Sequence, residues 1–412
     1  MIKYGINAVV GQSGGPTAAI NASLCGVISA ALSSKKIGTL YGMANGIDGF
    51  LNERLYDLTS IFTGKETELE KLKLTPGAAL GSCRFKLPTE EADPQFYKDL
   101  FDLLKKYEIG YFFYIGGNDS MDTTAKVSAY AAKNGIDIKV VGVPKTVDND
   151  LCGTDHTPGF GSAAKFVASV CAEIRRDTAV YKQKCVTIVE IMGRDAGWLT
   201  AASVLAKTDS SEGPDLIYLP ELPFSYEKCF EDIEKSWAEH PDILIAVSEG
   251  VKLEDGTYLG ADSSNVDKFG HAQLSGAAKV LEKKVKDHFG CKVRSIELNT
   301  PQRCASHISS LTDIKESTEV GYTAVFAATL DGLTGVMAGI VREDKKEYSS
   351  YYKCFDVSEI ANKVKGVPRE YINERGNNIT DEGIAYLRPL IVGECNITYK
   401  DGIPQHYIFP KI

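Results

Sequence analysis

Short apolar runs recur along the chain, and each is followed by a glycine-containing or polar turn, often with a helix-like stretch after it. These runs are Ile6–Val10, Tyr111–Ile115, Ile138–Val143, Val186–Ile191, Ile243–Val247 and Ser295–Leu298. A continuous apolar run is typical of a strand that is buried on both faces, and strands that alternate with helices form right-handed crossovers in a parallel sheet. Because the pattern occupies both halves, the sequence predicts an α/β protein with two doubly wound, Rossmann-like domains and mostly parallel sheets.

The segments between these runs are less uniform. Helices are expected from about Pro16 to Leu32 and from about Met121 to Asn134, directly after two of the turns. The stretch Leu51–Lys73 is charged and irregular, and we interpret it as a surface insertion. The tail from Val367 to Ile412 contains a strand-like run, Pro389–Val392, and is expected to pack on the second domain.

Ligands of doubly wound sheets bind beyond the carboxyl ends of the strands, and several polar loops are expected at that edge. The first, Gly11–Pro16, combines close backbone approach at Gly14 and Gly15 with the free N–H groups of a helix start, which attract anions. The alternative is a tight turn without a ligand. The loop is not a Walker A motif, because it has no lysine followed by serine or threonine.

Two further loops of the first half carry the most specific chemistry. In Gly116–Ser120, Asn118 and Asp119 could hold a cation, although one of these polar residues is also expected to cap the next helix. The segment Pro144–Asp150 places a lysine, a hydroxyl group and two carboxylates within six positions. It therefore offers a cation for phosphate and a general base, and the alternative is a solvated charged loop.

The second half adds cations and hydrogen-bonding groups at the ends of its own strands. These residues are Arg194 in the loop Met192–Gly197, Glu249, Arg294 and Arg303, with Arg84 of the first half as a further candidate. Any one of them alone would more often be an ordinary surface charge. The glycine pattern Gly159–Ala164 resembles a dinucleotide fingerprint, but no strand is predicted before it, so nicotinamide binding is not expected.

Composition and charge narrow the range of partners. The formal net charge of −9 argues against a general affinity for nucleic acid. No apolar run approaches the ~18 residues that a membrane helix needs, so no membrane partner is expected. The N-terminus lacks the pattern of a signal peptide, which favours a cytoplasmic protein. The ten cysteines are scattered without a CxxC pair, and we interpret them as small core residues.

The motifs SGGP, GGNDS, PKTVDND, MGRDAG, SEG and PQR follow one another in an order that resembles the 6-phosphofructokinases. Within that family the chain is similar to the pyrophosphate-dependent branch, whose members make fructose 1,6-bisphosphate reversibly from fructose 6-phosphate and pyrophosphate. The resemblance implies an active site in the cleft between the domains and a homodimer or homotetramer. It also implies a donor domain of residues 1–158 plus about 304–365, and a sugar-phosphate domain of about 159–303 plus 366–412.

The resemblance also implies roles for single residues. Asp148 would be the base that takes the proton from the sugar 1-hydroxyl. Pyrophosphate would be bound by Gly14, Gly15, Arg84, Asp119 and Lys145, and the sugar phosphate by Thr146, Met192, Gly193, Arg194, Glu249, Arg294, Thr300 and Arg303. The basic pair that binds effectors in allosteric bacterial members falls on Cys25 and Ser29, so allosteric control of that type is not expected.

Two positions bear on the phosphoryl donor. Members that use ATP usually carry glycine at the positions of Asp119 and Lys145. A carboxylate at Asp119 would repel a nucleotide α-phosphate, whereas an ammonium at Lys145 can neutralise a pyrophosphate that lacks the rest of ATP. Both features favour pyrophosphate. The alternatives are an ATP-dependent enzyme, the same chemistry on sedoheptulose 7-phosphate, and a non-catalytic sugar-phosphate sensor.

Magnesium is the expected cofactor, and the sequence leaves more than one set of residues that could bind it. The family usually has an aspartate at the position of Asn118, and an amide oxygen is a weaker ligand for a hard cation. We therefore expect Mg²⁺ at Asn118 and Asp119, with Asp148 or the pyrophosphate itself as alternatives. The substrate loop also differs, because Thr300 stands where the family more often has histidine or tyrosine.

Overall fold

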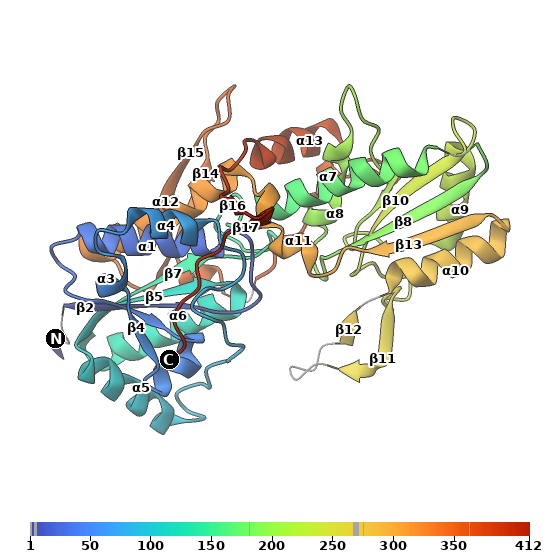
Figure 1. Cartoon of the computed structure of the whole chain (residues 1–412). Helices are drawn as coiled ribbons and strands as arrows, with labels where there is room; N and C mark the ends of the chain where they lie inside the picture. Colours follow the sequence, from blue (N-terminus) through green and yellow to red (C-terminus); the bar gives the residue numbers. More distant parts are fainter. Residues whose placement is uncertain (1, 4–5, 181, 267–271, 275, 362) are drawn as a thin grey trace.

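The computed structural model describes residues 2–3, 6–180, 182–266, 272–274, 276–361 and 363–412. The chain forms two lobes, and the first strand and the last residues both lie on the first lobe (Figure 1). The segment 145–158, which contains no strand, leads from the first lobe to the second.

The first lobe is built on a seven-stranded sheet in the order β15-β14-β7-β5-β2-β3-β4. Its central pairs are parallel, whereas the outer strands β4 and β15 pair antiparallel with β3 and β14. The strands are β2 (Asn7–Gln12), β3 (Leu40–Met43), β4 (Leu55–Asp57), β5 (Ile109–Gly116), β7 (Lys139–Pro144), β14 (Val336–Arg342) and β15 (Ser350–Asp356).

Helices cover both faces of this sheet (Figure 1). Phe112 and Val140 face a core that includes side chains of α5 and α6, whereas their neighbours Phe113 and Val141 face a core with α1 and α12. This alternation is why continuous apolar runs were needed in the sequence. The helices of the lobe are α1 (Ile20–Ser33), α2 (Gly46–Leu51), α3 (Leu58–Phe62), α4 (Glu66–Lys73), α5 (Pro94–Lys106), α6 (Asn118–Lys133) and α12 (Leu311–Thr329).

The second lobe has a four-stranded, fully parallel sheet in the order β13-β8-β10-β9. One face packs on α7 and α8, and the other face packs on α9 and α10. These elements are β8 (Cys185–Ile191), β9 (Leu216–Tyr218), β10 (Asp242–Ser248), β13 (Lys292–Glu297), α7 (Phe160–Thr178), α8 (Trp198–Ala202), α9 (Tyr226–Ser236) and α10 (Ala277–Phe289).

Smaller elements complete the chain. The hairpin of β11 (Ala261–Val266) and β12 (Ala272–Leu274) projects from the second lobe, and the short helix α11 (Pro301–Cys304) lies between the lobes (Figure 1). The others are β1 (Ile2–Lys3), β6 (Ile136–Asp137), α13 (Asp381–Leu387), β16 (Tyr399–Lys400), β17 (Ile403–Pro404) and the 3-10 helices at Ser203–Ala206, Ser306–Ile308, Val357–Glu359, Arg369–Tyr371 and Arg388–Ile391.

The predicted fold class is confirmed, and three local predictions differ from the structure. The stretch Leu51–Lys73 contains the helices α3 and α4, whose apolar side chains Leu58, Phe62 and Leu72 enter the first core. The expected strand Pro389–Val392 is largely a 3-10 helix, since it packs as part of a helical segment after α13.

The end of the tail also differs from its predicted place. Residues 367–390 do contribute to the core of the second lobe, through side chains such as Val367 and Leu390. Phe409, however, lies in the first lobe, where its ring is 4.8 Å from that of Tyr56 and 6.0 Å from that of Phe62. An aromatic pair this close buries apolar surface that α3 and β4 would otherwise expose.

Candidate functional site

The loops singled out in the sequence follow the carboxyl ends of six strands, three in each lobe. They follow β2, β5, β7, β8, β10 and β13. Electrostatic contacts join the two groups of loops, because Asp195 and Arg303 of the second group both influence the pKa of Asp148 in the first. The site is therefore assembled from both lobes.

Asp148 lies at the centre of this arrangement. The Thr146 hydroxyl donates to Asp148 Oδ2 over 3.1 Å and accepts from the Asp148 backbone N–H over 3.2 Å. Burial raises the pKa of Asp148, while the hydrogen bond from Thr146 and the charge of Lys145 oppose the rise. A carboxylate with a raised pKa is a better proton acceptor than one in water, so this environment suits a general base.

Lys145 links the loop of Asp148 to the glycine turn after β2. Its side chain is 2% exposed, and its Nζ donates to the Gly15 carbonyl oxygen over 2.6 Å. Burial lowers the pKa of Lys145 to about 8, although the carboxylates of Asp148 and Asp150 act in the opposite direction. The ammonium of Lys145 therefore lies beside the glycine turn after β2, where a phosphate can approach the backbone closely.

The two glycines of that turn leave room for these cations. A Cβ on Gly14, which has a φ of +76°, would lie 3.2 Å from the Nζ of Lys145. A Cβ on Gly15 would lie 3.5 Å from Nη1 of Arg303. The absence of side chains at both positions lets cations from both lobes approach the same backbone.

Arg303 reaches this point from α11 of the second group. Its Nε is buried and has no hydrogen-bond partner within the part of the chain that the structure describes. An unpaired, buried guanidinium N–H is costly, and an anion such as a phosphate would satisfy it. Thr300, the residue just before α11, is exposed on the same loop.

The loop after β8 is tied to the loop after β10. The Gly193 N–H donates to Oε1 of Glu249 over 3.3 Å, and the Ser248 hydroxyl donates to the Gly193 carbonyl oxygen over 2.6 Å. Burial and, to a smaller extent, the charge of Asp148 raise the pKa of Glu249 to about 7, although the Gly193 N–H and Arg194 act in the opposite direction. Glu249 therefore belongs to the same electrostatic group as Asp148.

The two expected magnesium ligands, Asn118 and Asp119, are the first two residues of α6. Asn118 opens α6, and its Oδ1 is buried without a hydrogen-bond partner in the described structure. Its Nδ2 is 3.5 Å from Oδ2 of Asp150, whereas Asp119 is exposed in the first turn of the helix. The unpaired amide oxygen of Asn118 can serve as a neutral ligand of a hard cation that keeps several waters. Among the described residues, no three histidine, cysteine or acidic side chains form a metal-binding group.

Two predicted arginines lie apart from the buried centre. Arg294 pairs with Thr187 in the middle of the β13–β8 ladder, four residues before β8 ends at Ile191, which is roughly 13 Å along the strand. Its guanidinium is 3.8 Å from a carboxylate oxygen of Asp177. The structure therefore does not bring Arg294 to Asp148 within this chain. Arg84 is exposed, but its charge is close enough to lower the pKa of Lys145.

Sequence reasoning missed several residues that shape the site. Gln302 accepts a hydrogen bond from the Met192 N–H over 3.1 Å, which fixes α11 against the loop after β8. Asn149 is fully buried between the two acidic residues of its loop. Gln302 is the middle residue of the PQR motif, and Asn149 lies within PKTVDND. Both are polar residues inside motifs that the sequence analysis had already singled out, and this position is the signal that could have identified them.

The chain is similar to known proteins along nearly its whole length. A family model described as phosphofructokinase matches residues 7–328. The chain is 40% identical over 405 residues to the pyrophosphate–fructose 6-phosphate 1-phosphotransferase of Halomonas elongata, which covers 97% of this chain and 95% of that protein.

Two solved structures are also similar. The pyrophosphate-dependent phosphofructokinase from Nitrosospira multiformis matches with a TM-score of 0.87 and 38% identity over 99% of this chain and 98% of that one. The pyrophosphate-dependent phosphofructokinase from Marinobacter aquaeolei matches with a TM-score of 0.85 and 38% identity over 98% of each chain. Of the helices that the structure describes, none is long and apolar enough to cross a membrane.

Proposed function

The chain belongs to the phosphofructokinase family, and we propose that it transfers a phosphoryl group from pyrophosphate to the 1-hydroxyl of fructose 6-phosphate, with Asp148 as the general base. The observation that carries this proposal is the adjacency of Lys145 and Asp148. One is a buried cation beside the glycine turn, and the other is a desolvated carboxylate. A single loop thus supplies a group for the donor and a group for the acceptor.

The residues divide the work of the reaction between the lobes. Asp148 takes the proton of the sugar hydroxyl, and Thr146 holds the carboxylate in place. Gly14, Gly15, Lys145 and Arg84 surround the donor, whereas Met192, Gly193, Arg194, Glu249, Thr300 and Arg303 surround the sugar phosphate. Because phosphoryl transfer depends mainly on positioning and charge neutralisation, these groups need no covalent intermediate.

Donor choice is proposed to rest on Lys145 and Asp119. The ammonium of Lys145 is held against the glycine turn, where it can neutralise a compact pyrophosphate. The exposed carboxylate of Asp119 would repel the additional phosphate of a nucleotide. The names of the relatives, which include pyrophosphate, support the same donor.

Magnesium is proposed to bind at Asn118 and Asp150 rather than at Asn118 and Asp119. The support is the buried, unpaired Oδ1 of Asn118, together with the carboxylate of Asp150, whose Oδ2 lies 3.5 Å from Nδ2 of the same amide group. When bound there, Mg²⁺ would neutralise charge on the phosphates. Burial raises the pKa of Asp150 to about 7, and a cation nearby would keep this carboxylate ionised.

The wider setting of the reaction belongs to the proposal as well. Transfer is reversible, since pyrophosphate and a sugar bisphosphate are comparable phosphoryl donors, and the active form is a homodimer or homotetramer. All ten cysteines are unpaired, which fits a reducing compartment such as the cytoplasm.

The donor assay tests the reaction class. Purified protein is incubated with fructose 6-phosphate, Mg²⁺ and either pyrophosphate or ATP, and bisphosphate formation is followed. Turnover with pyrophosphate and not with ATP is expected, and turnover with ATP alone would refute the proposed donor. Replacing fructose 6-phosphate by sedoheptulose 7-phosphate in the same assay compares the turnover of the two acceptors.

The base is tested by Asp148→Ser. Turnover is expected to fall by several orders of magnitude, whereas calorimetric binding of fructose 6-phosphate is kept, because the loss affects proton transfer. Asp137→Ser, a surface change before β7, is the matched control and should leave turnover unaltered. Full activity in Asp148→Ser would remove this carboxylate from the mechanism.

A further inference from the structure

Asn149, the residue after the proposed base, has a backbone conformation that needs outside support. Its φ is +54°, in the left-handed region that most residues with a side chain avoid and that asparagine adopts at a smaller cost than they do. It is also fully buried. Such a conformation persists only where surrounding contacts hold it, and a change in the peptide between residues 148 and 149 would move the carboxylate of Asp148.

The side-chain amide of Asn149 is held at both ends. Its Oδ1 accepts from the Thr157 N–H over 3.0 Å, and its Nδ2 donates to the Tyr386 hydroxyl over 3.3 Å. The Tyr386 hydroxyl in turn donates to the Asp155 carbonyl oxygen over 2.7 Å. Tyr386 thus joins the loop of the base to the segment 155–157.

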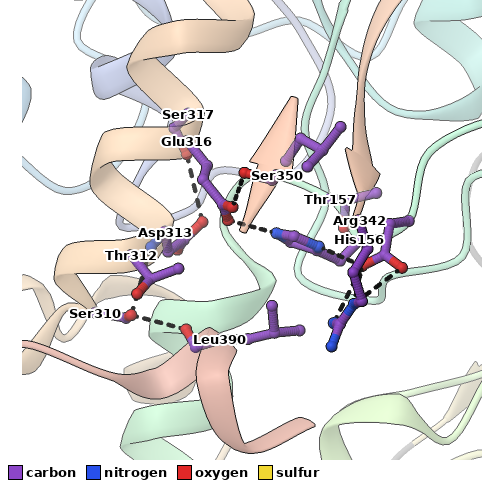
Figure 2. Close-up of polar contacts among 12 residues, drawn as sticks. His156, Thr157, Ser310, Thr312, Asp313, Glu316, Ser317, Arg342, Ser350 and Leu390 are labelled. Atoms are coloured by element: carbon purple, nitrogen blue, oxygen red, sulfur yellow. Dashed lines mark hydrogen bonds and ion pairs between the residues drawn. The ribbon is translucent and has the colours of Figure 1, made fainter. Parts of the chain in front are cut away.

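That segment is itself anchored by buried charges (Figure 2). His156 lies between two carboxylates, with Nδ1 2.8 Å from Asp155 and Nε2 2.7 Å from Glu316. Burial lowers the pKa of His156, but Glu316 and Asp155 outweigh this effect and raise it to about 9. At neutral pH the imidazolium therefore donates to both carboxylates and fixes the segment against α12.

Arg342 fixes Tyr386 to the same anchor. Its guanidinium contacts the Asp155 carboxylate at 3.2 Å and donates to the Tyr386 carbonyl oxygen over 3.0 Å. The guanidinium carbon also lies 4.4 Å from the centre of the Tyr386 ring. The ring therefore has one position, and its hydroxyl group has a defined direction.

We propose that Tyr386 is a positioning residue that holds Asp148 in place through the side chain of Asn149. Tyr386 lies on α13, in a part of the chain beyond the residues 7–328 that match the phosphofructokinase family model. The C-terminal segment would thereby complete the catalytic loop. This inference rests on the proposed role of Asp148 as base.

The first test is Tyr386→Phe, which removes one oxygen and keeps the ring. The change removes both hydrogen bonds of the Tyr386 hydroxyl, the one from Asn149 and the one to the Asp155 carbonyl oxygen. Since the bond from Asn149 is the one that acts on the base, we expect kcat to fall about 3- to 15-fold, while the KM values for pyrophosphate and fructose 6-phosphate change less than twofold. Calorimetric titration with fructose 6-phosphate should still show a full complement of binding sites, which excludes a smaller folded fraction as the cause.

The matched control is Tyr371→Phe. The Tyr371 ring lies 5.6 Å from that of Tyr386, in the same aromatic cluster, but the hydrogen bonds to Asn149 and Asp155 are made by the Tyr386 hydroxyl and not by that of Tyr371. This control should keep the wild-type kcat. If both variants lose kcat equally, general packing explains the effect and the proposal is wrong.

A double-mutant cycle tests the route through Asn149. Asn149→Gly removes the amide, and glycine tolerates a φ of +54°. In that background Tyr386→Phe should lower kcat no further, because the group it acts through is absent. An undiminished additional loss would overturn the proposal. Failure of the base assignment would appear separately, as activity retained in Asp148→Ser.

Discussion

Replacing Lys145 by methionine is expected to stabilise the free protein and to weaken its use of pyrophosphate. Methionine has a similar length and no charge, so the change removes the ammonium without leaving a large cavity. Lys145 is 2% exposed, and burial lowers its pKa from 10.5 to about 8. Burying the charged ammonium of Lys145 therefore costs the folded protein free energy.

The size of the effect follows from that pKa. A difference of 10.5 to about 8 corresponds to about 3 kcal/mol, at 1.36 kcal/mol per pKa unit. Loss of the hydrogen bond to the Gly15 carbonyl offsets about 1 kcal/mol. Asp148 and Asp150 have raised pKa values and can take up a proton when the cation is gone. A net gain of about 1–2 kcal/mol is expected.

The gain has a defined pH dependence. Below pH 8 Lys145 is protonated in both the folded and the unfolded protein, so the folded state bears the full cost. Between pH 8 and 10.5 the unfolded chain holds more protons than the folded one, and wild-type stability rises with pH. The advantage of Lys145→Met should therefore be largest at pH 7 and disappear by about pH 10.5.

Function should change in the opposite direction. A charge-assisted contact to phosphate is worth about 1.5–3 kcal/mol, so the KM for pyrophosphate should rise about 10- to 100-fold. The KM for fructose 6-phosphate should change much less, because Lys145 faces the glycine turn.

The assay combines thermal melting without ligand at pH 7 and pH 9.5 with steady-state kinetics. A rise in Tm of about 1–2 °C at pH 7 is expected for a chain of this length. Lys139→Met is the matched control, because Lys139 lies at the other end of β7 and pairs with Asp137 on the surface. A less stable Lys145→Met protein with an unchanged KM for pyrophosphate would refute the reasoning.

Two further predictions follow from the site and the fold. Burial raises the pKa of Glu249 to about 7, so its contribution to stability is present below pH 4.5 and is lost as pH rises through 7. Glu249→Gln should flatten this loss in melting curves from pH 4.5 to 8, and an unchanged slope would contradict it. A Cβ on Gly26 would lie 2.0 Å from the Thr318 carbonyl oxygen where α1 crosses α12. Gly26→Ala should cost about 1–3 kcal/mol in denaturant unfolding, whereas Ser33→Ala on the exposed end of α1 should cost little.

Local pattern was enough to predict the fold class and to single out the loop at the centre of the proposed site. Buried strands appear as apolar runs, and the loop of Lys145 and Asp148 brings its groups together within a few residues. Lys145 and Asp148 are close to each other because both lie in the loop directly after β7. Their proximity could therefore be predicted without knowledge of any contact between distant parts of the chain. Local pattern did not predict α3 and α4, because these helices have few apolar residues. Those residues are recognisable as core residues only once they are seen to pack with the side chains of α1.

Contacts between distant segments were decided by the tertiary structure alone. The pairing of Asn118 with Asp150, and not with Asp119, depends on where α6 begins relative to β7. The register of β13 on β8 sets Arg294 back from the strand ends, although the sequence placed it beside the end of a predicted strand. Tyr386 reaches Asn149 across 237 residues of chain. The sequence determined which chemical groups are available. The packing of the two lobes determined which of these groups are in contact, because the neighbours of a side chain come from distant parts of the chain.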